Sequence, residues 1–453
     1  MSASTAQIEF GKAEGEQDDS GKIERSTLTK VSLRLLPLIV VLYCVAYIDR
    51  TNVSFAALTM NADLGLSTSV YGLGAGIFFL GYFIFEVPSN LILEKTGARV
   101  WIARIMITWG ILSAATAFAT GPVSYLVLRF LLGAAEAGFF PGMILYFTYW
   151  YPQAYRGRVI SALFIAQPVA NALAATVSGA ILQYVDGVLG LRGWQWIFIL
   201  EALPALLLAV VVLAMLTDRP AVAAWLAASE RTWLEGRLAR ERQQIDRAGR
   251  LSLWQALADP RVFALSMMYL TSVTANYGIV FFMPQIVKGM HLSHLMTGYV
   301  TAVPYIVGTV GLLAWGWSSD RANERRWHLI AASCLAGAGL VCAGLFGSSY
   351  WALAGMAAAT TGIYGSRASF WPMPSIFLTG TAAAGAIALI NAIGNLGGAI
   401  APTIVGWIKD QTGSFEAGLY FLAACGFACA VITFFAAHAS TRPKDAPAVN
   451  PAE

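Results

Sequence analysis

Long apolar segments recur along this sequence, each of the length that an α-helix needs to cross a lipid bilayer. Only 12% of the 453 residues are charged and 57% are hydrophobic, which is too little charge to cover the surface of a soluble protein. We therefore predict an all-α membrane protein with twelve transmembrane helices. The predicted spans are 35–57, 70–92, 100–119, 123–149, 158–184, 194–216, 262–286, 296–318, 327–346, 350–373, 380–407 and 416–437.

The spans divide into two groups of six, separated by one long charged segment. This pattern predicts an N-terminal bundle over 31–216, a connector over 217–261 and a C-terminal bundle over 262–438. The connector has helical spacing and is expected to be amphipathic. Residues 1–30 lack the order of a cleaved signal peptide and are expected to form a disordered tail, and residues 439–453 form a second tail.

The positions of Lys and Arg predict the orientation, because cytoplasmic loops retain positive charge. With both termini inside, the short inner loops contain Lys95, Arg99, Arg104, Arg156, Arg158, Arg321, Arg325 and Arg326. The outer loops contain Arg192, Lys288 and Lys409. We predict a multi-pass protein of the bacterial inner membrane, with cytoplasmic termini. A net charge of +4 indicates no nucleic-acid partner.

Charged residues inside the spans are the strongest indication of function, since each costs roughly 2.5–3.5 kcal/mol at a helix centre. Five ionisable residues lie well inside predicted spans: Asp49, Arg50, Arg129, Glu136 and Arg367. Glu86 and Glu201 lie nearer span ends, where water and head groups are expected to reach them. Intramembrane charges typically face a cavity and serve the function of the protein.

Asp49 and Arg50 are adjacent and point about 100° apart on a helix, so each needs its own partner. A substrate carboxylate suits Arg50, because a guanidinium matches a carboxylate with two hydrogen bonds. A proton suits Asp49, because burial favours the neutral form of a carboxyl group. The alternative is that both are structural, held by neighbouring helices.

Arg129 and Glu136 lie seven residues apart on the fourth span and share one face, about 10 Å apart along the axis. Protonation of Glu136 would then release Arg129 to another partner. A static ion pair that holds helices together is the alternative interpretation.

A charged loop motif follows the second span of each half. The second-half copy has the spacing G-x-x-x-D-R-x-x-x-R-R at Gly316, Asp320, Arg321, Arg325 and Arg326. The first-half copy, "SNLILEKTGAR", is degraded, with Glu94 in the acidic position and no glycine at its head. This loop resembles the gating signature of the major facilitator superfamily, and the resemblance extends over all twelve spans.

Within that superfamily, four stretches resemble the anion:cation symporter family: "YIDRTNVSFAAL", "GYFIFEVPSNLIL", "RFLLGAAEAGFFPG" and "NAIGNLGGAIAPTIVGWIKD". The family includes bacterial galactonate, tartrate and aromatic-acid permeases, animal sialin and vesicular glutamate transporters. The resemblance implies that Arg50 binds the substrate anion. It also implies that Asp49 and Glu136 couple transport to protons, with Arg129 as the companion of Glu136.

The resemblance to the galactonate permease also implies further substrate contacts. The matching residues are Tyr47, Tyr82 and Gln167, with Ser369, Trp371, Asn391 and Asn395 in the tenth and eleventh spans. Arg367 departs from the sugar-acid pattern, and either grips a second carboxylate opposite Arg50 or only attracts anions from one end of the cavity. Asn276, on the seventh span, is a further candidate for a hydrogen bond to substrate.

These residues predict a transporter that imports a small organic anion with protons by alternating access. A dicarboxylate or aromatic acid is favoured over a sugar acid, because Phe370 and Trp371 adjoin Arg367. An anion exchanger or efflux carrier with the same cavity is the alternative. A receptor or enzyme is disfavoured, since the sequence has no nucleophile triad, metal-ligand set or phosphate-binding loop. We expect a monomer whose partners are the organic acid, protons and lipid, and which needs no cofactor or metal.

Overall fold

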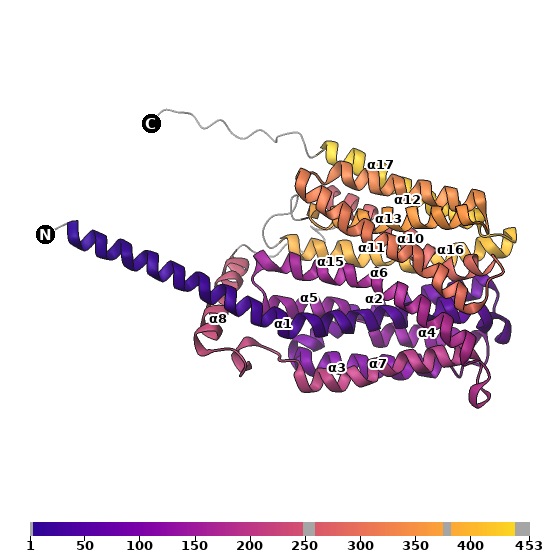
Figure 1. The fold of residues 1–453 in the computed structure, drawn as a ribbon, viewed down its shortest axis with the longest axis horizontal. Coiled ribbons are helices and arrows are strands. Elements are labelled where there is room, and N and C mark those ends of the chain that lie inside the picture. Colours follow the sequence, from indigo (N-terminus) through magenta and orange to yellow (C-terminus); the bar gives the residue numbers. More distant parts are fainter. Residues whose placement is uncertain (1–2, 248–258, 375–381, 440–453) are drawn as a thin grey trace.

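The computed structural model describes residues 3–247, 259–374 and 382–439, and within these ranges the secondary structure is almost entirely helical (Figure 1). The N-terminal half contains α1 (Ala3–Asp63), α2 (Thr68–Thr96), α3 (Ala98–Thr116), α4 (Pro122–Glu136), α5 (Phe139–Trp150), α6 (Gln153–Tyr184) and α7 (Gly193–Met215). The C-terminal half contains α10 (Pro260–Lys288), α11 (His294–Ala322), α12 (Arg326–Phe346), α13 (Tyr350–Phe370), α15 (Ala382–Asn395), α16 (Gly397–Thr412) and α17 (Glu416–Ala439).

Every predicted span coincides with one helix or with two consecutive helices, which confirms the all-α membrane fold. The span at 123–149 is divided between α4 and α5, where Gly138 has a φ of 85° and Pro141 follows soon after. Among the described residues, eleven helical segments are long and apolar enough to cross a membrane. The remaining predicted span is α13, whose Gly, Ser, Thr and Arg residues reduce its hydropathy, but it packs against α11 and α12 in the same bundle.

The N-terminal segment differs from the expected disordered tail, because α1 begins at Ala3 and continues without a break into the first span (Figure 1). The last turns of its polar part, around Ser26 and Lys30, are held against α8 (Ala228–Arg247), the helix of the connector. Lys30 Nζ lies 2.7 Å from Glu230 Oε1, and Ser26 donates to the same oxygen at 2.7 Å. These tertiary contacts favour helix where composition alone predicts none.

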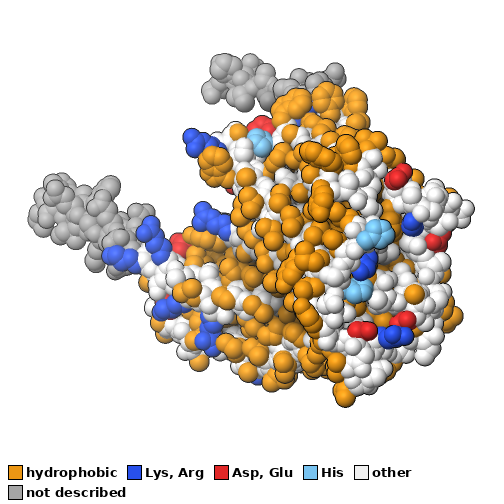
Figure 2. Space-filling view, turned by 45° about the vertical axis from the view of Figure 1, so that its right-hand side comes forward, with side chains coloured by type: hydrophobic (Ala, Val, Ile, Leu, Met, Phe, Trp, Pro, Cys, Tyr) orange, Lys and Arg blue, Asp and Glu red, His pale blue; other side chains and the backbone are white. Residues whose placement is uncertain are grey.

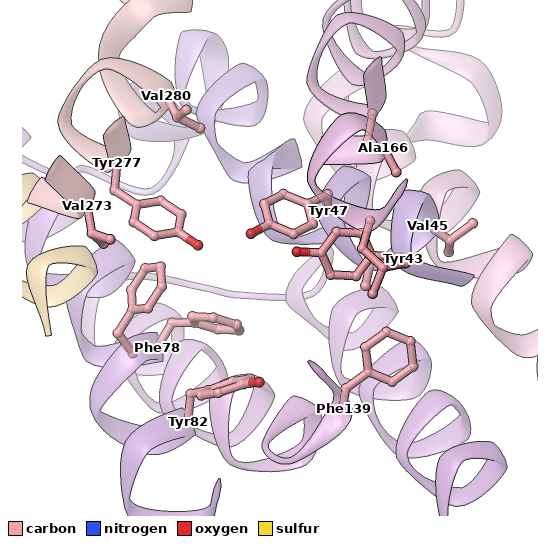
Figure 3. Packing of buried hydrophobic residues seen from close by; sticks show 14 of the residues in the cluster. Tyr43, Val45, Tyr47, Phe78, Tyr82, Phe139, Ala166, Val273, Tyr277 and Val280 are labelled. Atoms are coloured by element: carbon pink, nitrogen blue, oxygen red, sulfur yellow. The ribbon is translucent and has the colours of Figure 1, made fainter. Parts of the chain in front are cut away.

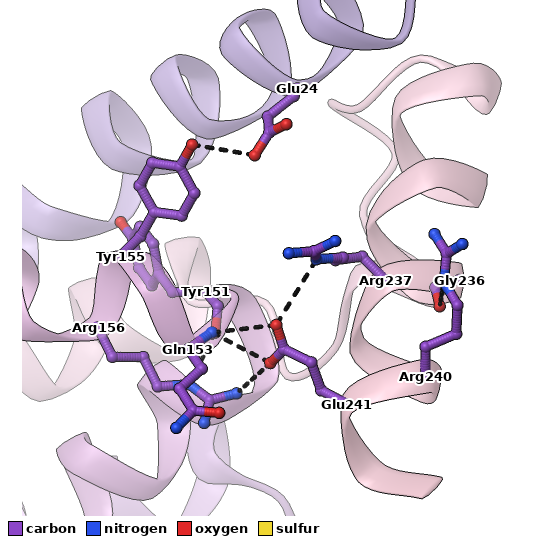
Figure 4. A network of polar contacts seen from close by, with 9 residues as sticks. All are labelled: Glu24, Tyr151, Gln153, Tyr155, Arg156, Gly236, Arg237, Arg240 and Glu241. Atoms are coloured by element: carbon purple, nitrogen blue, oxygen red, sulfur yellow. Dashed lines mark hydrogen bonds and ion pairs between the residues drawn. The ribbon is translucent and has the colours of Figure 1, made fainter. Parts of the chain in front are cut away.

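A second set of polar contacts fixes α8 to the start of α6 (Figure 4). Glu241 accepts a hydrogen bond from the backbone N–H of Gln153 at 3.1 Å and forms an ion pair with Arg156 at 3.2 Å. A carboxylate is favourable at this helix N-terminus, where backbone N–H groups lack partners. We call the end of the bundle that carries α8 the connector end, and the opposite end the distal end.

The two halves meet through helix pairs that occupy corresponding places in each half. α2 packs against α16, α6 against α11, and α1 against α10. Toward the distal end the backbones approach closely through glycine: a Cβ on Gly179 of α6 would lie 2.9 Å from the Cα of Gly298 on α11. Gly72 of α2 lies similarly close to the backbone of Pro402 on α16. Small residues are typical of such tight helix contacts in membranes.

The outer surface of the bundle is largely apolar, with charged side chains gathered toward its two ends (Figure 2). Large hydrophobic side chains point outward from many helices, including Val87 (66% exposed), Leu207 (68%) and Val310 (63%). An exposed apolar surface of this extent is suited to lipid rather than water.

Replacing Gly179 by Ala is expected to destabilise this arrangement by about 1–3 kcal/mol, because the added methyl group overlaps the backbone of α11. Gly157→Ala on the same helix is the matched control, since a Cβ there meets nothing within 4 Å. We expect a lower Tm in detergent for Gly179→Ala and an unchanged or slightly higher Tm for the control. Equal shifts in the two variants would contradict close packing of the halves at Gly179.

Candidate functional site

A cavity lies between the two halves and receives side chains from both. Arg50 from α1 and Arg367 from α13 supply positive charge to its wall. The lining residues are Tyr43, Tyr47, Arg50, Phe79, Tyr82, Phe140, Phe164, Gln167, Tyr269, Val273, Tyr277, Arg367, Asn391 and Asn395.

Arg50 forms a buried ion pair with Glu136, the last residue of α4. The break after α4 places this carboxylate against the guanidinium. A second nitrogen of Arg50, Nη1, donates to the hydroxyl of Tyr277 on α10 at 3.3 Å, so the side chain also connects the two halves. Only 8% of Arg50 is exposed. The ion pair offsets the large cost of removing two charges from water.

Aromatic rings surround the Arg50 guanidinium. Its central carbon lies 5.2 Å from the ring centre of Tyr47, 5.3 Å from that of Tyr82 and 5.5 Å from that of Phe78. These are cation–π distances. Figure 3 shows rings of α1, α2 and α10 converging on one space, with Tyr277 opposite Tyr47. These rings limit the Arg50 side chain to a few positions, in which its two terminal nitrogens bond to Tyr277 and Glu136.

Arg129 does not pair with Glu136 in the structure, although the two residues lie on one helix. Its Nε donates to the backbone oxygen of Gly74 at 3.4 Å, and its guanidinium carbon lies 4.9 Å from the ring of Phe78. The family resemblance implied Arg129 as the companion of Glu136, whereas the structure pairs Glu136 with Arg50. Arg129 is completely buried beside the cavity.

Asp49 points away from the cavity into the N-terminal bundle, as its 100° offset from Arg50 predicts. Its Oδ1 accepts hydrogen bonds from the hydroxyl of Ser113 on α3 and, at 3.3 Å, from Asn52. Its other oxygen has no hydrogen-bond partner. Asp49 is fully buried and lies within electrostatic reach of Glu136.

Arg367 provides the second cavity cation, from the C-terminal half. Its Nη1 donates to the side-chain oxygen of Gln167 on α6, so it also contacts the opposite half. Nearby, Asn171 of α6 donates to the hydroxyl of Tyr364 at 3.1 Å. Each half therefore contributes one arginine that bonds to a neutral residue of the other half.

Ten residues were predicted to bind substrate, and the structure places seven of them around the cavity. These are Tyr47, Arg50, Tyr82, Gln167, Arg367, Asn391 and Asn395. The other three do not line it. Asn276 and Ser369 are fully buried, with side-chain polar atoms that lack hydrogen-bond partners. Trp371 packs on Phe164 of the opposite half, with ring centres 5.8 Å apart, because the chain turns at the end of α13.

Sequence reasoning did not identify several aromatic residues of the cavity, among them Tyr43, Phe79 and Tyr269. Helical spacing was an available signal for two of them. Tyr43 precedes Tyr47 by four residues, and Phe79 precedes Tyr82 by three, so each pair shares a face. Tyr269 had no comparable local signal.

The predicted gating motif lies at the connector end, over the last turns of α11 and the turn that leads to α12. Arg325 forms an ion pair with Asp320 at 2.5 Å and donates to Ser319 at 2.9 Å. Arg321 lies over the ring of Trp317, and Gly316 faces Ala368 of α13. These contacts remain within the C-terminal half and fix the turn between α11 and α12.

The arrangement is suited to binding an anion. It offers two guanidinium groups, several hydroxyl and amide groups and aromatic faces in a closed space. In the described part of the chain, no group of three or more His, Cys, Asp or Glu side chains is placed to hold a metal ion.

Comparison with known proteins identifies relatives along almost the whole chain. A family model described as "Major Facilitator Superfamily" matches residues 39–384. A putative tartrate transporter of Agrobacterium vitis is 48% identical, and the match covers 93% of each chain. A quinolone resistance transporter of Acinetobacter baumannii is 42% identical, over 88% of this chain and 92% of that relative.

A solved structure has the same fold. It is a bacterial homologue of the human lysosomal transporter Spinster, crystallised in an inward-facing and occupied conformation. It matches with a TM-score of 0.71 and 17% identity, over 89% of this chain and 96% of that one. At this identity the likeness concerns the fold alone.

Removal of one partner of the Arg50–Glu136 pair is expected to destabilise the protein by about 3–5 kcal/mol, because an unpaired charge stays buried. Arg50→Gln and Glu136→Gln should each lower the free energy of unfolding, and the double variant should lose less than the sum of the two. Denaturant unfolding in detergent measures this coupling. The more exposed pair Arg192–Asp63 is the control, with an expected coupling below about 1 kcal/mol. A similar coupling in both pairs would argue against a buried ion pair.

Proposed function

This chain belongs to the major facilitator superfamily, with relatives of the anion:cation symporter type, and we propose that it imports a small organic anion by proton symport. The protein is a multi-pass membrane transporter rather than an enzyme. What the proposal adds is the substrate class, the proton and the direction of transport.

The observation that carries the proposal is the ion pair between Arg50 and Glu136 in the cavity wall. A substrate carboxylate and Glu136 compete for the same guanidinium. A proton on Glu136 removes one competitor and leaves Arg50 free to bind the anion. Proton binding and anion binding therefore strengthen each other, which is the condition for symport.

Asp49 serves as a second proton site in this proposal. It has no cationic partner in the described structure, and a buried carboxylate without one is costly. It lies close enough to Glu136 for the charge of one to act on the other. The positive charge of Arg129 acts on both Asp49 and Glu136, and it balances whichever of these two carboxyl groups is ionised.

The substrate proposed is a dicarboxylate, with tartrate as the first candidate. Arg50 and Arg367 line one cavity and come from opposite halves, so an acid with two carboxylates can bind both. The tyrosines, Asn391 and Asn395 suit a hydroxylated acid. The putative tartrate transporters of Agrobacterium vitis support this choice.

The two halves contact each other both near the distal end and on the connector side of the cavity. This arrangement is suited to transport by alternating access. Close helix packing seals the distal end, while Phe164 and Trp371 stack across the halves on the connector side. We propose that the connector end is cytoplasmic, together with both termini, because the basic loops gather there. We expect the protein to function as a monomer, with the motif at Asp320 and Arg325 in gating.

The second candidate function is efflux or anion exchange through the same cavity. The quinolone resistance transporter of Acinetobacter baumannii favours this alternative. A symporter requires a proton gradient for accumulation, whereas an exchanger requires a counter-substrate inside the vesicle.

Uptake into proteoliposomes separates these candidates. Reconstituted protein is given tartrate, other dicarboxylates and aromatic monocarboxylates, with an inward proton gradient present or collapsed. We expect accumulation of a dicarboxylate only when the gradient is present. Accumulation only in vesicles preloaded with an anion would overturn symport. In Asp49→Asn, binding should persist while gradient-driven accumulation is lost.

Glu136→Gln is expected to make anion binding nearly independent of pH, because the amide cannot compete with the substrate for Arg50. In the wild type, affinity should rise as the pH falls and Glu136 becomes protonated. Titration of tartrate by calorimetry at several pH values measures both. Glu230→Gln, on α8 far from the cavity, is the control. A variant that keeps the wild-type pH dependence would show that Glu136 does not set it.

Arg367→Gln is expected to weaken dicarboxylate binding by about ten- to a hundredfold, the loss of one charge-assisted hydrogen bond. Binding of a matched monocarboxylate should change much less, since Arg50 still holds its single carboxylate. Arg50→Gln is the comparison and should weaken both acids. Equal weakening of both acids by Arg367→Gln would mean that Arg367 acts only by general attraction.

A further inference from the structure

A third buried carboxyl group lies in the N-terminal bundle, outside the cavity. Glu201 of α7 is only 4% exposed, although its place near a span end predicted access to water. Its Oε1 accepts a hydrogen bond from the hydroxyl of Ser178 on α6 at 2.6 Å. Its Oε2 has no hydrogen-bond partner. Within the described residues, no ion pair includes Glu201.

Among the described residues, the groups that act on Glu201 are the Ser178 hydroxyl and the Asp49 carboxyl, and neither is positively charged. α7 packs against α1, α3 and α6. From α1, Asp49 is the charged group whose field reaches Glu201, and it has the same sign. On α3, Ser113 donates a hydrogen bond to Asp49. A carboxylate in this position would be repelled by Asp49 and have a single hydroxyl to stabilise it, so one proton is the simplest way to neutralise it.

Glu201 and Asp49 share one pattern of contacts. In each, one carboxyl oxygen accepts from a serine hydroxyl and the other has no partner. That is the pattern of a carboxylic acid whose proton is carried by the free oxygen. Glu136 differs, because Arg50 balances its charge.

Glu201 lies nearer the distal end of the bundle than Asp49 does. It lies eight residues from the first residue of α7, which is about 12 Å along the helix. Asp49 lies fourteen residues from the distal end of α1, about 21 Å. Glu136 lies fourteen residues from the first residue of α4, also about 21 Å, so Glu201 lies nearer the distal end than Asp49 and Glu136, which share one depth.

We propose that Glu201 is a proton-binding site on the route between the distal end and Asp49. The inference rests on the proposed proton symport and extends it to a residue outside the cavity. A proton that enters at the distal end resides on Glu201 before it passes to Asp49. Release toward Asp49 leaves Glu201 ionised, which favours uptake of the next proton. Ser178 acts as a positioning residue that orients the acid.

Glu201→Gln tests the proposal, because the amide oxygen still accepts from Ser178 while the side chain cannot exchange a proton. A pH gradient of one unit supports about tenfold accumulation for one coupled proton. In proteoliposomes we expect Glu201→Gln to lose this accumulation and to keep anion counterflow, which needs no net proton movement. Ser178→Ala is the matched control: it removes the hydrogen bond, keeps the carboxyl and should still accumulate anion.

Wild-type accumulation in Glu201→Gln would overturn the proposal. Equal loss of counterflow in Glu201→Gln and Ser178→Ala would also overturn it, since both would then reflect structure alone. If Glu201→Gln is not recovered folded, Glu201→Asp replaces it, and an unchanged pH profile of uptake would count against the proposal. A wild type that fails to accumulate anion with the gradient rejects symport itself, and this inference with it.

Discussion

The buried ion pair between Arg50 and Glu136 is the interaction on which the site depends. Each charge alone would be too costly in the membrane interior, so the protein can hold either one only while the other, or a substitute, is present. An anion can substitute for Glu136, and a proton can neutralise it. The same energetic constraint that limits charges in the bundle therefore links substrate binding to protonation.

The contacts between the halves are compatible with a change of conformation. Each bundle is held together by broad apolar helix packing. The halves meet through glycine contacts and through hydrogen bonds that Arg50 and Arg367 donate to neutral side chains of the other half. The hydrogen bond from Arg50 to Tyr277 can break without leaving an isolated charge, because Arg50 keeps Glu136 within its own half. Movement of one bundle against the other therefore leaves the costliest interaction intact.

Sequence reasoning identified the spans and the charged residues because both are set by local composition. The thickness of the bilayer determines the length of a span, and a charge within one stands out against apolar neighbours. Partners are set by tertiary packing instead. The family resemblance implied Arg129 as the companion of Glu136, but in the fold Arg50 of α1 is the residue that pairs with it. The contact of α1 with α8, through Lys30 and Glu230, depends on tertiary packing in the same way.

The separation between the acids and the cavity constrains how coupling can work. Asp49 does not line the cavity, and Glu136 contacts the arginine that does. A proton on Asp49 can therefore influence substrate only through Glu136, by changing the charge that this carboxylate experiences. Because Arg129 also acts on Asp49, the balance among two acids and two arginines sets when Arg50 is released. Coupling therefore depends on these two acids and two arginines together, and of the four only Arg50 contacts the anion.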